Sequence, residues 1–293
     1  MVLPLAVLGV FLAFGQQDAS TVALGKKLFF DGRLSEDGSV SCATCHIPEE
    51  GFADHHAISP GVFGRKGNRH TPSLIARAAG ALHFWDGRSP SLEQQVLEPI
   101  RNPNEMSMTV AGVVRRLRED PAMKHFTETT LAAALAAYVR TIRSEDAPAD
   151  LFLKQGGGPL SPLALEGFRL FRDRARCYIC HSGGQFTDES FHNTGIAWRN
   201  GTLLDEGRAI VTGKPYHRGA FKTPALREIA RTAPYMHDGS IATLEAVVEF
   251  YDKGGNRNPW LDPNLQPLHL TPADKQALIA FLRALSGTVR DGL

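Results

Sequence analysis

The stretches Cys42-Ala-Thr-Cys45-His46 and Cys177-Tyr-Ile-Cys180-His181 place all four cysteines of the chain in two copies of one pattern, C-x-x-C-H. In this pattern the two thiols form thioethers with the vinyl groups of a c-type haem, and the histidine supplies the proximal nitrogen to its iron. One copy would also fit a redox-active pair or half of a zinc site, but two copies that both end in histidine favour haem. We therefore predict two covalently bound haem c groups. Their predicted attachment residues are Cys42, Cys45, Cys177 and Cys180, and their predicted proximal iron ligands are His46 and His181.

The size and charge of the chain suit a two-domain protein and exclude an electrostatic nucleic-acid binder. Its 293 residues are enough for two domains of ordinary size, each able to bury a core and a cofactor. The chain has 32 lysine and arginine residues and 31 aspartate and glutamate residues. Because the two charges nearly balance, the composition indicates no excess of positive charge that would attract nucleic acid or an anionic membrane. We expect no nucleic-acid partner.

The N-terminus carries an apolar run, Met1 to Phe14, which ends at the polar residues Gln16-Gln17-Asp18. This run is too short to span a membrane and has the length of a signal-peptide core, although no lysine or arginine precedes it. A buried N-terminal helix is the alternative. We predict a signal peptide at residues 1–20, export to the periplasm, and no membrane contact after its removal.

The two haem motifs lie in two similar halves of the chain. Leu24-Gly25-Lys-Lys-Leu28-Phe29 precedes the first motif, and Leu165-Glu-Gly167-Phe-Arg-Leu170-Phe171 precedes the second. Each half also closes on a similar segment with apolar residues at helical spacing, 134–142 and 277–285. We predict a mainly α fold of two cytochrome-c-like helical domains in tandem, each with one haem. The predicted domains are residues 21–145 and 163–293, joined by a glycine- and proline-rich linker at 146–162.

A further match within the repeat makes the two predicted haems unequal. Fourteen residues separate Thr71 from Trp85 and Thr223 from His237 (85 − 71 = 237 − 223 = 14), and the same register pairs Pro99 with Tyr251. Proline cannot ligate iron, whereas a tyrosine can do so through its phenolic oxygen. The repeat thus predicts an open sixth position on the N-terminal iron and a closed one on the C-terminal iron. The alternative is that Tyr251 is a core aromatic residue on an apolar helix face.

The chain resembles the bacterial dihaem cytochrome c peroxidase and MauG superfamily from Leu24 to Gly287. Besides the haem motifs, the resemblance rests on Phe84-Trp85-Asp86-Gly87-Arg88, Asn102-Pro103-Asn104-Glu105-Met106 and Ala233-Pro234-Tyr235-Met236-His237-Asp238-Gly239. It implies that the N-terminal haem reacts with peroxide while the C-terminal haem takes or stores electrons. It also implies that Trp85 bridges the haems, and that Gln95 and Glu105 form the distal-pocket pair, with Glu105 moving a peroxide proton.

Two departures from conventional cytochrome c peroxidases indicate the MauG-like branch. The position of their distal histidine, which caps the peroxidatic haem until reduction, corresponds to Val62, and the position of their methionine ligand corresponds to Tyr251. An anionic phenolate favours higher oxidation states than a thioether does. The resemblance therefore implies a His/Tyr-ligated C-terminal haem and a peroxidatic haem that needs no reductive activation.

Two other departures concern the substrate and a metal. MauG places a surface tryptophan two residues before its second haem motif, and this chain has Ala175 there, which argues against methylamine dehydrogenase maturation. The superfamily's calcium between the haems uses a loop asparagine and backbone near Thr232 and Pro234. His70 stands at the asparagine position, and its nitrogen is a poor ligand for a hard cation, although backbone carbonyls and waters could still hold one.

The predicted function is a periplasmic dihaem peroxidase that reduces hydrogen peroxide. The expected electron donor is a small redox protein (a cytochrome c or a cupredoxin) or a protein substrate. One alternative is a conventional peroxidase activated by reduction, with His70 or His55 as the mobile cap. The other is a dihaem electron-transfer cytochrome with two six-coordinate irons.

Overall fold

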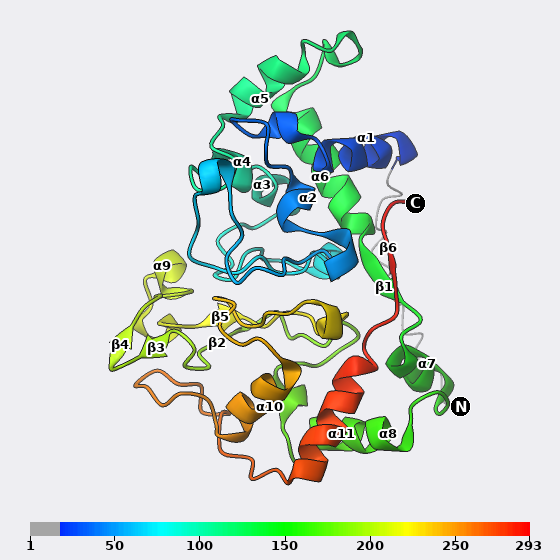
Figure 1. The fold of residues 1–293 in the computed structure, drawn as a ribbon, viewed down its shortest axis with the longest axis vertical. Helices are drawn as coiled ribbons and strands as arrows, with labels where there is room; N and C mark the ends of the chain where they lie inside the picture. The colour runs from blue at the N-terminus through cyan, green and yellow to red at the C-terminus, as the bar shows by residue number, and fades with distance from the viewer. Residues whose placement is uncertain (1–17) are drawn as a thin grey trace, which may run out of the picture.

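The computed structural model describes residues 18–293, and most of its regular structure is helical (Figure 1), so the prediction of a mainly α fold is confirmed. The predicted signal peptide lies outside the described residues up to position 17, and residues 18–20 form the cap and start of the first helix. The helices are α1 (Ala19–Phe29), α2 (Cys42–Cys45), α3 (Leu92–Gln95), α4 (Glu98–Arg101), α5 (Val110–Leu117), α6 (Glu128–Thr141), α7 (Pro148–Gln155), α8 (Pro162–Arg172), α9 (Ala209–Thr212), α10 (Leu244–Asp252) and α11 (Pro272–Arg283).

Strands are short and occur as three antiparallel pairs. The pairs are β1 (Arg143–Glu145) with β6 (Thr288–Arg290), β2 (Phe191–His192) with β5 (Phe221–Lys222), and β3 (Trp198–Arg199) with β4 (Thr202–Leu203). None of the helices within residues 18–293 combines the length and the apolar character that a membrane crossing requires.

The long helices begin at residues that can cap them. The Asp18 carboxylate accepts the N–H of Thr21 at the start of α1, and the Ser161 hydroxyl accepts the N–H of Ala164 at the start of α8. Thr271 and Asp274 form a reciprocal capping box at the start of α11. These local signals fix where the helices begin, and burial of their apolar faces decides how they pack.

The internal repeat is visible in how the first and last helices of each half pack. A Cβ on Gly25 of α1 would lie 1.9 Å from the carbonyl oxygen of Ala134 on α6. A Cβ on Gly167 of α8 would lie the same 1.9 Å from the carbonyl oxygen of Ala277 on α11. Only glycine permits this approach of two helix backbones, so both glycines of the repeated motif have the same structural role.

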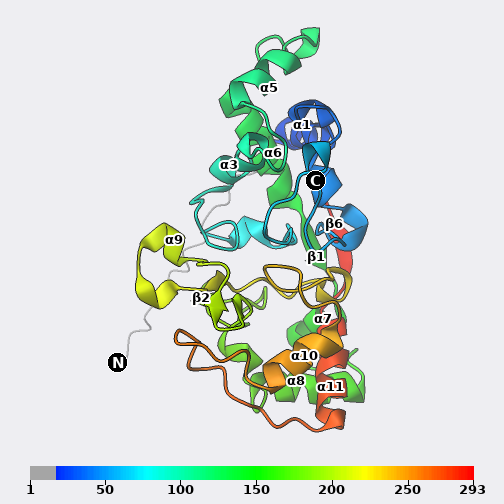
Figure 2. The same ribbon diagram turned by 60° about the vertical axis from the view of Figure 1, so that its left-hand side comes forward.

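Each half has its own buried apolar cluster. The first cluster is centred on α1 and α6 and includes Phe29 and Tyr138, whose ring centroids lie 5.1 Å apart. The second is centred on α8 and α11 and includes Phe171 and Phe281, also 5.1 Å apart. Figures 1 and 2 show the two halves as two bodies stacked along the long axis of the molecule, with irregular loops facing each other between them.

The segment predicted as a linker has more structure than its composition suggests. Within 146–162 the chain forms α7, where the N–H of Ala149 donates to the carbonyl of Ala284 and Asp150 pairs with Arg227 at 2.5 Å. Strand β1, just before it, pairs with β6 at the C-terminal end of the chain. The connection is therefore fastened to the C-terminal half, because long-range contacts that leave no local signal order it.

The helices that follow the two Asp-Gly turns differ between the halves. The C-terminal half has the continuous helix α10, whereas the N-terminal half has two short helices, α3 and α4, interrupted at residues 96–97. Pro99 lies in the first turn of α4, where its missing N–H is tolerated, but it could not donate to continue α3. The proline that distinguishes the two halves in sequence thus also breaks the helix.

Candidate haem sites and the residues between them

The first haem motif occupies α2, and its histidine is oriented by the backbone. The Nδ1–H of His46 donates to the carbonyl of Phe52 at 3.0 Å, which leaves Nε2 free for a metal. Phe52 has a positive φ of 57°, the backbone conformation in which its carbonyl accepts this bond. Burial lowers the pKa of His46 to about 4, so the imidazole is neutral, as an iron ligand must be.

The second motif repeats this arrangement. The Nδ1–H of His181 donates to the carbonyl of Phe186 at 2.9 Å, and Phe186 also has a positive φ, 55°. Burial again lowers the pKa of the histidine. A histidine whose outer nitrogen is bound to a backbone carbonyl is typical of metal ligation, and two such histidines in equivalent places fit two irons.

The cysteines also fit covalent haem. All four are free thiols, and burial raises the pKa of both Cys42 and Cys177 to about 12. Protonated thiols in apolar surroundings are unsuited to a thiolate metal site or a nucleophile, whereas thioether formation removes the ionisable group altogether. The residues therefore fit haem c at both motifs.

A cavity adjoins the second motif, and its lining includes apolar side chains from α10 and α11, such as Leu244, Val248 and Leu278. Cys177, Cys180 and His181 line it, and so does Tyr251 from α10. Burial first, and then the nearby Cys180 and Cys177, raise the pKa of the Tyr251 phenol. The structure thus brings Tyr251 to the same cavity as the second haem motif.

Near the first motif, the loop that carries Val62 packs directly on the segment that carries Glu105. The N–H of Val62 donates to the carbonyl of Glu105 at 2.8 Å, and a Cβ on Gly61 would lie 2.1 Å from the carbonyl oxygen of Asn104. Val62 is fully buried. An apolar side chain that cannot bind iron therefore lies beside the predicted acid–base residue.

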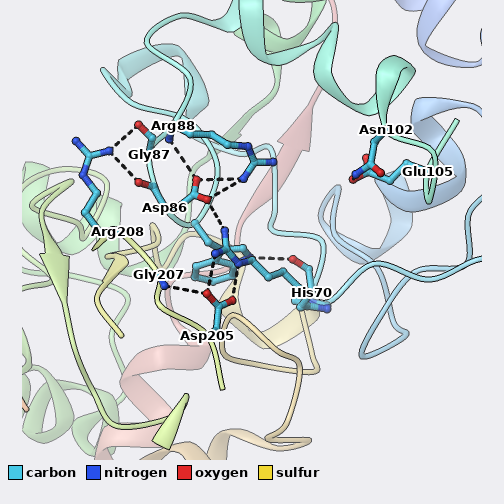
Figure 3. A network of polar contacts seen from close by, with 11 residues as sticks. His70, Asp86, Gly87, Arg88, Asn102, Glu105, Asp205, Gly207 and Arg208 are labelled. Carbon is cyan, nitrogen blue, oxygen red and sulfur yellow. Dashed lines mark hydrogen bonds and ion pairs between the residues drawn. The ribbon is translucent and has the colours of Figure 1, made fainter. Parts of the chain in front are cut away.

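The Glu105 carboxylate is held by its own segment. The amide Nδ2–H of Asn102 donates to Glu105 Oε1 at 2.6 Å (Figure 3), and burial outweighs this bond, so the pKa of Glu105 is raised. A raised pKa suits a carboxyl that exchanges a proton near neutral pH. Gln95, predicted to act with Glu105, ends α3 and is half-buried, but it makes no hydrogen bond to Glu105 in the described structure.

Trp85 lies between the two halves. Its indole N–H donates to the carbonyl of His70 at 2.8 Å, and its own carbonyl accepts the N–H of Lys222 from β5 at 2.8 Å. Both Trp85 and His70 line the cavity of the second motif, although they belong to the N-terminal half. This placement accords with the predicted bridging role.

His70 is buried and tied to both halves. Its Nδ1–H donates to the carbonyls of His56 and Ala57, at 3.0 and 3.2 Å, and its backbone N–H donates to the carbonyl of His237 at 2.7 Å. The imidazole thus presents nitrogen, not oxygen, where the family's calcium ligand would be, and it uses neighbouring carbonyls as its own acceptors. These residues do not fit calcium.

A charged network that the sequence analysis missed joins the halves beside Trp85 (Figure 3). Arg69 binds Asp86 through Nη1 at 2.6 Å and Asp205 through Nε at 2.8 Å, and Arg88 binds Asp86 at 3.0 Å. Arg208 donates to the carbonyls of Asp86 and Gly87, both at 2.8 Å. Asp86 precedes Gly87, and by sequence this pair indicates only a turn. Its partners lie up to 122 residues away and share no spacing that could have revealed them.

His192 was also missed. It lines the second cavity, with Nδ1 2.6 Å from Asp262 and Nε2 3.0 Å from Asp188. The hydrogen bond to Asp262, followed by the Cys180 thiol, raises the pKa of His192 to about 11, so the imidazole is protonated. It is a half-buried cation in the lining of the cavity, and no sequence motif marks it.

Comparisons with known proteins agree with this geometry. The family model described as di-haem cytochrome c peroxidase matches residues 19–157. The methylamine utilization protein MauG of Methylorubrum extorquens is 40% identical over 90% of this chain and 77% of its own length. The cytochrome c551 peroxidase of Pseudomonas aeruginosa is 33% identical over 90% of this chain and 78% of its own length.

A solved structure supports the same relationship. The crystal structure of a MauG-like protein associated with microbial copper homeostasis superposes with a TM-score of 0.85 at 31% identity, over 93% of this chain and 91% of that one. The relatives thus include MauG and cytochrome c peroxidases. This chain has two pairs of cysteines for haem attachment and two histidines that backbone carbonyls orient. The chain belongs to the di-haem cytochrome c peroxidase and MauG family of oxidoreductases, whose cofactor is haem c.

Proposed function

We propose that this protein is a periplasmic peroxidase of the MauG-like type, which reduces hydrogen peroxide at an open N-terminal haem. The observation that carries the proposal is the asymmetry of the two sites: Val62 and Pro99 belong to the first, and Tyr251 lines the second. In this proposal residues 21–145 form the peroxidatic domain and residues 163–293 the electron-transfer domain. Export follows from the apolar N-terminal run and from c-type haem attachment outside the cytoplasm.

Bound haem would supply the irons that react with peroxide and hold oxidising equivalents. Cys42, Cys45 and His46 would hold the first group, and Cys177, Cys180 and His181 the second. Glu105 takes a proton from the attacking oxygen of peroxide and returns it to the leaving oxygen, and Asn102 holds its carboxylate in place. Gln95 is assigned to the same pocket. Val62 offers no atom that could ligate iron, because its side chain is apolar.

Trp85 is the proposed connection between the two sites. It lines the second cavity, and its indole N–H is fixed by His70, so the ring is held in one orientation. Tyr251 and His181 would both hold the second iron. A phenolate ligand stabilises higher oxidation states, so the second site can share the two equivalents that peroxide supplies.

The electron donor is proposed to contact the surface around the second haem motif. Tyr178 and Ile179 lie between the two haem-linked cysteines and are 43% and 45% exposed. Arg172 lies over the Tyr178 ring at 6.0 Å, and neither Arg172 nor the exposed Arg176 has an acidic partner within the described residues. An apolar centre with a positive rim suits a small acidic redox protein, such as a cytochrome c or a cupredoxin, or an acidic protein substrate.

Electron paramagnetic resonance of the ferric protein tests the proposal. We expect one high-spin and one low-spin haem, and turnover of peroxide by the fully oxidised protein. Two low-spin signals that persist until one-electron reduction would overturn it and indicate the conventional, reductively activated enzyme. Two low-spin signals with no peroxide reaction in either state would indicate an electron carrier. His70, one of the two candidate caps in the conventional enzyme, donates its Nδ1–H to the carbonyls of His56 and Ala57, which supports the open first site.

A further inference from the structure

A second cluster of metal-binding side chains lies in the loop after the first haem motif, outside both haem sites. Asp54, His55 and His56 each offer one ligand atom, and these three atoms lie within 4.8 Å of one another. His56 Nδ1 is 2.8 Å and His55 Nδ1 is 3.8 Å from the same oxygen, Asp54 Oδ1. The two imidazole rings lie side by side, with centroids 4.2 Å apart and planes inclined by 35°.

The carboxylate of this cluster is unlike an ordinary surface aspartate. Asp54 is only 1% exposed, and its second oxygen, Oδ2, is buried without any hydrogen-bond donor. A buried carboxylate charge is costly, and a cation bound at Oδ1, the oxygen that both histidine nitrogens approach, would lower this cost. The side chains of His55 and His56 are 55% and 49% exposed. The cluster therefore has a buried carboxylate on the inside and two imidazoles open to solvent.

The donor set points to a class of metal. Two imidazole nitrogens and one carboxylate oxygen suit Zn²⁺, Ni²⁺ or Cu²⁺, whereas Ca²⁺ and Mg²⁺ need oxygen ligands. Bonds of about 2.0–2.2 Å require ligand atoms roughly 3.0–3.5 Å apart. His56 Nδ1, at 2.8 Å from Asp54 Oδ1, must therefore move slightly away from this oxygen, and His55 Nδ1, at 3.8 Å, must move toward it. The exposed histidines can do this by side-chain rotation. We propose that Asp54, His55 and His56 form a surface site for a divalent transition metal, with water completing the coordination.

The proposed site is connected to the centre of the molecule. The carbonyl of His56 accepts the Nδ1–H of His70, and the carbonyl of His70 accepts the indole N–H of Trp85. A Cβ on Gly239 would lie 2.6 Å from the Cα of Ala57, so the loop is wedged against the C-terminal half. Metal binding at 54–56 would therefore stiffen the contact between the halves beside Trp85.

Isothermal titration of the dihaem protein with Zn²⁺, after removal of metal by a chelator, tests this site. We expect one equivalent of Zn²⁺ to bind. His55→Ala and His56→Ala should each lower the affinity by at least about tenfold, because even the loss of a residue that only hydrogen-bonds to a metal ligand lowers metal affinity by about 10- to 100-fold. His125→Ala and His269→Ala, which remove exposed histidines elsewhere, should leave the affinity unchanged. Equal affinity in all variants, or no binding, would overturn the proposal.

Cu²⁺ gives a second readout that identifies the ligands. The copper signal should show hyperfine structure from two imidazole nitrogens, and from one in either histidine variant. A signal without imidazole coupling, or one that both variants leave unchanged, would contradict the site. Unchanged haem absorption spectra establish that the variants are folded. Because the readout is metal binding, its failure is distinct from failure of the peroxidase proposal, which peroxide turnover tests.

Discussion

The indole N–H of Trp85 donates to the backbone carbonyl of His70 at 2.8 Å, and both side chains line the cavity of the second haem motif. Two residues of the N-terminal half thus form part of the wall of the C-terminal site. In the proposed function this contact connects the two sites. The carbonyl of Trp85 also accepts the N–H of Lys222 from the C-terminal half.

Replacing Trp85 by phenylalanine should slow the transfer of oxidising equivalents between the sites. Phenylalanine is harder to oxidise than tryptophan and cannot donate to His70. After rapid mixing with peroxide, the optical changes of the two haems should occur together in the wild type and separately in the variant. Trp198→Phe is the control, because that ring packs on Trp260 outside the cavity. Simultaneous changes in Trp85→Phe would exclude the bridging role.

Tyr251→Phe should remove the sixth ligand of the second iron. We expect the low-spin signal of the ferric protein to be replaced by a high-spin one, because phenylalanine offers no donor atom. Tyr235→Phe is a matched control: Tyr235 lines the same cavity, but its hydroxyl donates to the carbonyl of Ile229 at 2.9 Å. An unchanged low-spin spectrum in Tyr251→Phe would show that tyrosine is not the ligand.

Glu105→Gln should lower the rate of peroxide reduction by about 10²- to 10⁴-fold, the usual contribution of a positioned acid–base group. Burial raises the pKa of Glu105, so its basic form appears only as the pH rises through a value above that of an ordinary glutamate. In the wild type, the rate of peroxide reduction should rise with pH through this range. In the variant, this rise should be absent. Glu166→Gln, at an exposed ion pair with Arg169 in the C-terminal half, should preserve both the rate and its pH dependence.

Arg69→Met should destabilise the contact between the halves. Removing one partner of a buried ion pair costs about 3–5 kcal/mol, and Arg69 neutralises both Asp86 and Asp205. The free energy of unfolding, measured with denaturant, should fall by this amount. Arg283→Met, at an exposed pair with Glu245, should change it by about 1 kcal/mol or less. A loss no larger than that of the control would show that the network is incidental.

The same network predicts an acid-labile contact. Burial alone would raise the pKa of Asp205, but hydrogen bonds from Arg69 and the Gly207 N–H outweigh it, and the pKa is lowered. A carboxylate with a depressed pKa stabilises the fold above its unfolded pKa, and this stabilisation is lost as the pH falls through the folded value. Acid should therefore destabilise the wild type more than Arg69→Met. Equal acid sensitivity of the two proteins would contradict this assignment.

Reversing the charge of Arg172 or Arg176 should weaken the reaction with an acidic electron donor. With a reduced acidic cupredoxin as donor, kcat/KM should fall by about tenfold at low ionic strength and recover toward the wild type in high salt. Arg115→Glu reverses an exposed charge on α5, at the far end of the molecule (Figure 1), and should have a much smaller effect. A salt-independent loss would place the donor elsewhere.

Much of the fold was predictable because its signals are local. The repeated apolar segments became α6 and α11, and the repeated Gly25 and Gly167 became the closest points between helices. The linker was less predictable: its glycines and prolines indicated flexibility, whereas α7 is ordered by contacts to Ala284 and Arg227 that lie far along the chain.

The candidate sites divide in the same way. The pairing of Pro99 with Tyr251 could be predicted from a register that runs without gaps, and the structure places Tyr251 at the second cavity. The packing of Val62 on Glu105, the charged state of His192 and the ion pairs of Arg69 could not be predicted. Each depends on a contact between loops whose course is set by the packing of other segments.

By itself, the sequence predicted two haems and their points of attachment, because attachment is a covalent reaction of a five-residue motif, and it predicted their difference, because the repeat pairs Pro99 with Tyr251. Only the tertiary structure decided which residues form the contact between the halves. Trp85, His70, Arg69 and Asp205 meet across an interface that no periodicity encodes, because loop residues brought together from up to 136 positions apart leave no regular spacing in the chain.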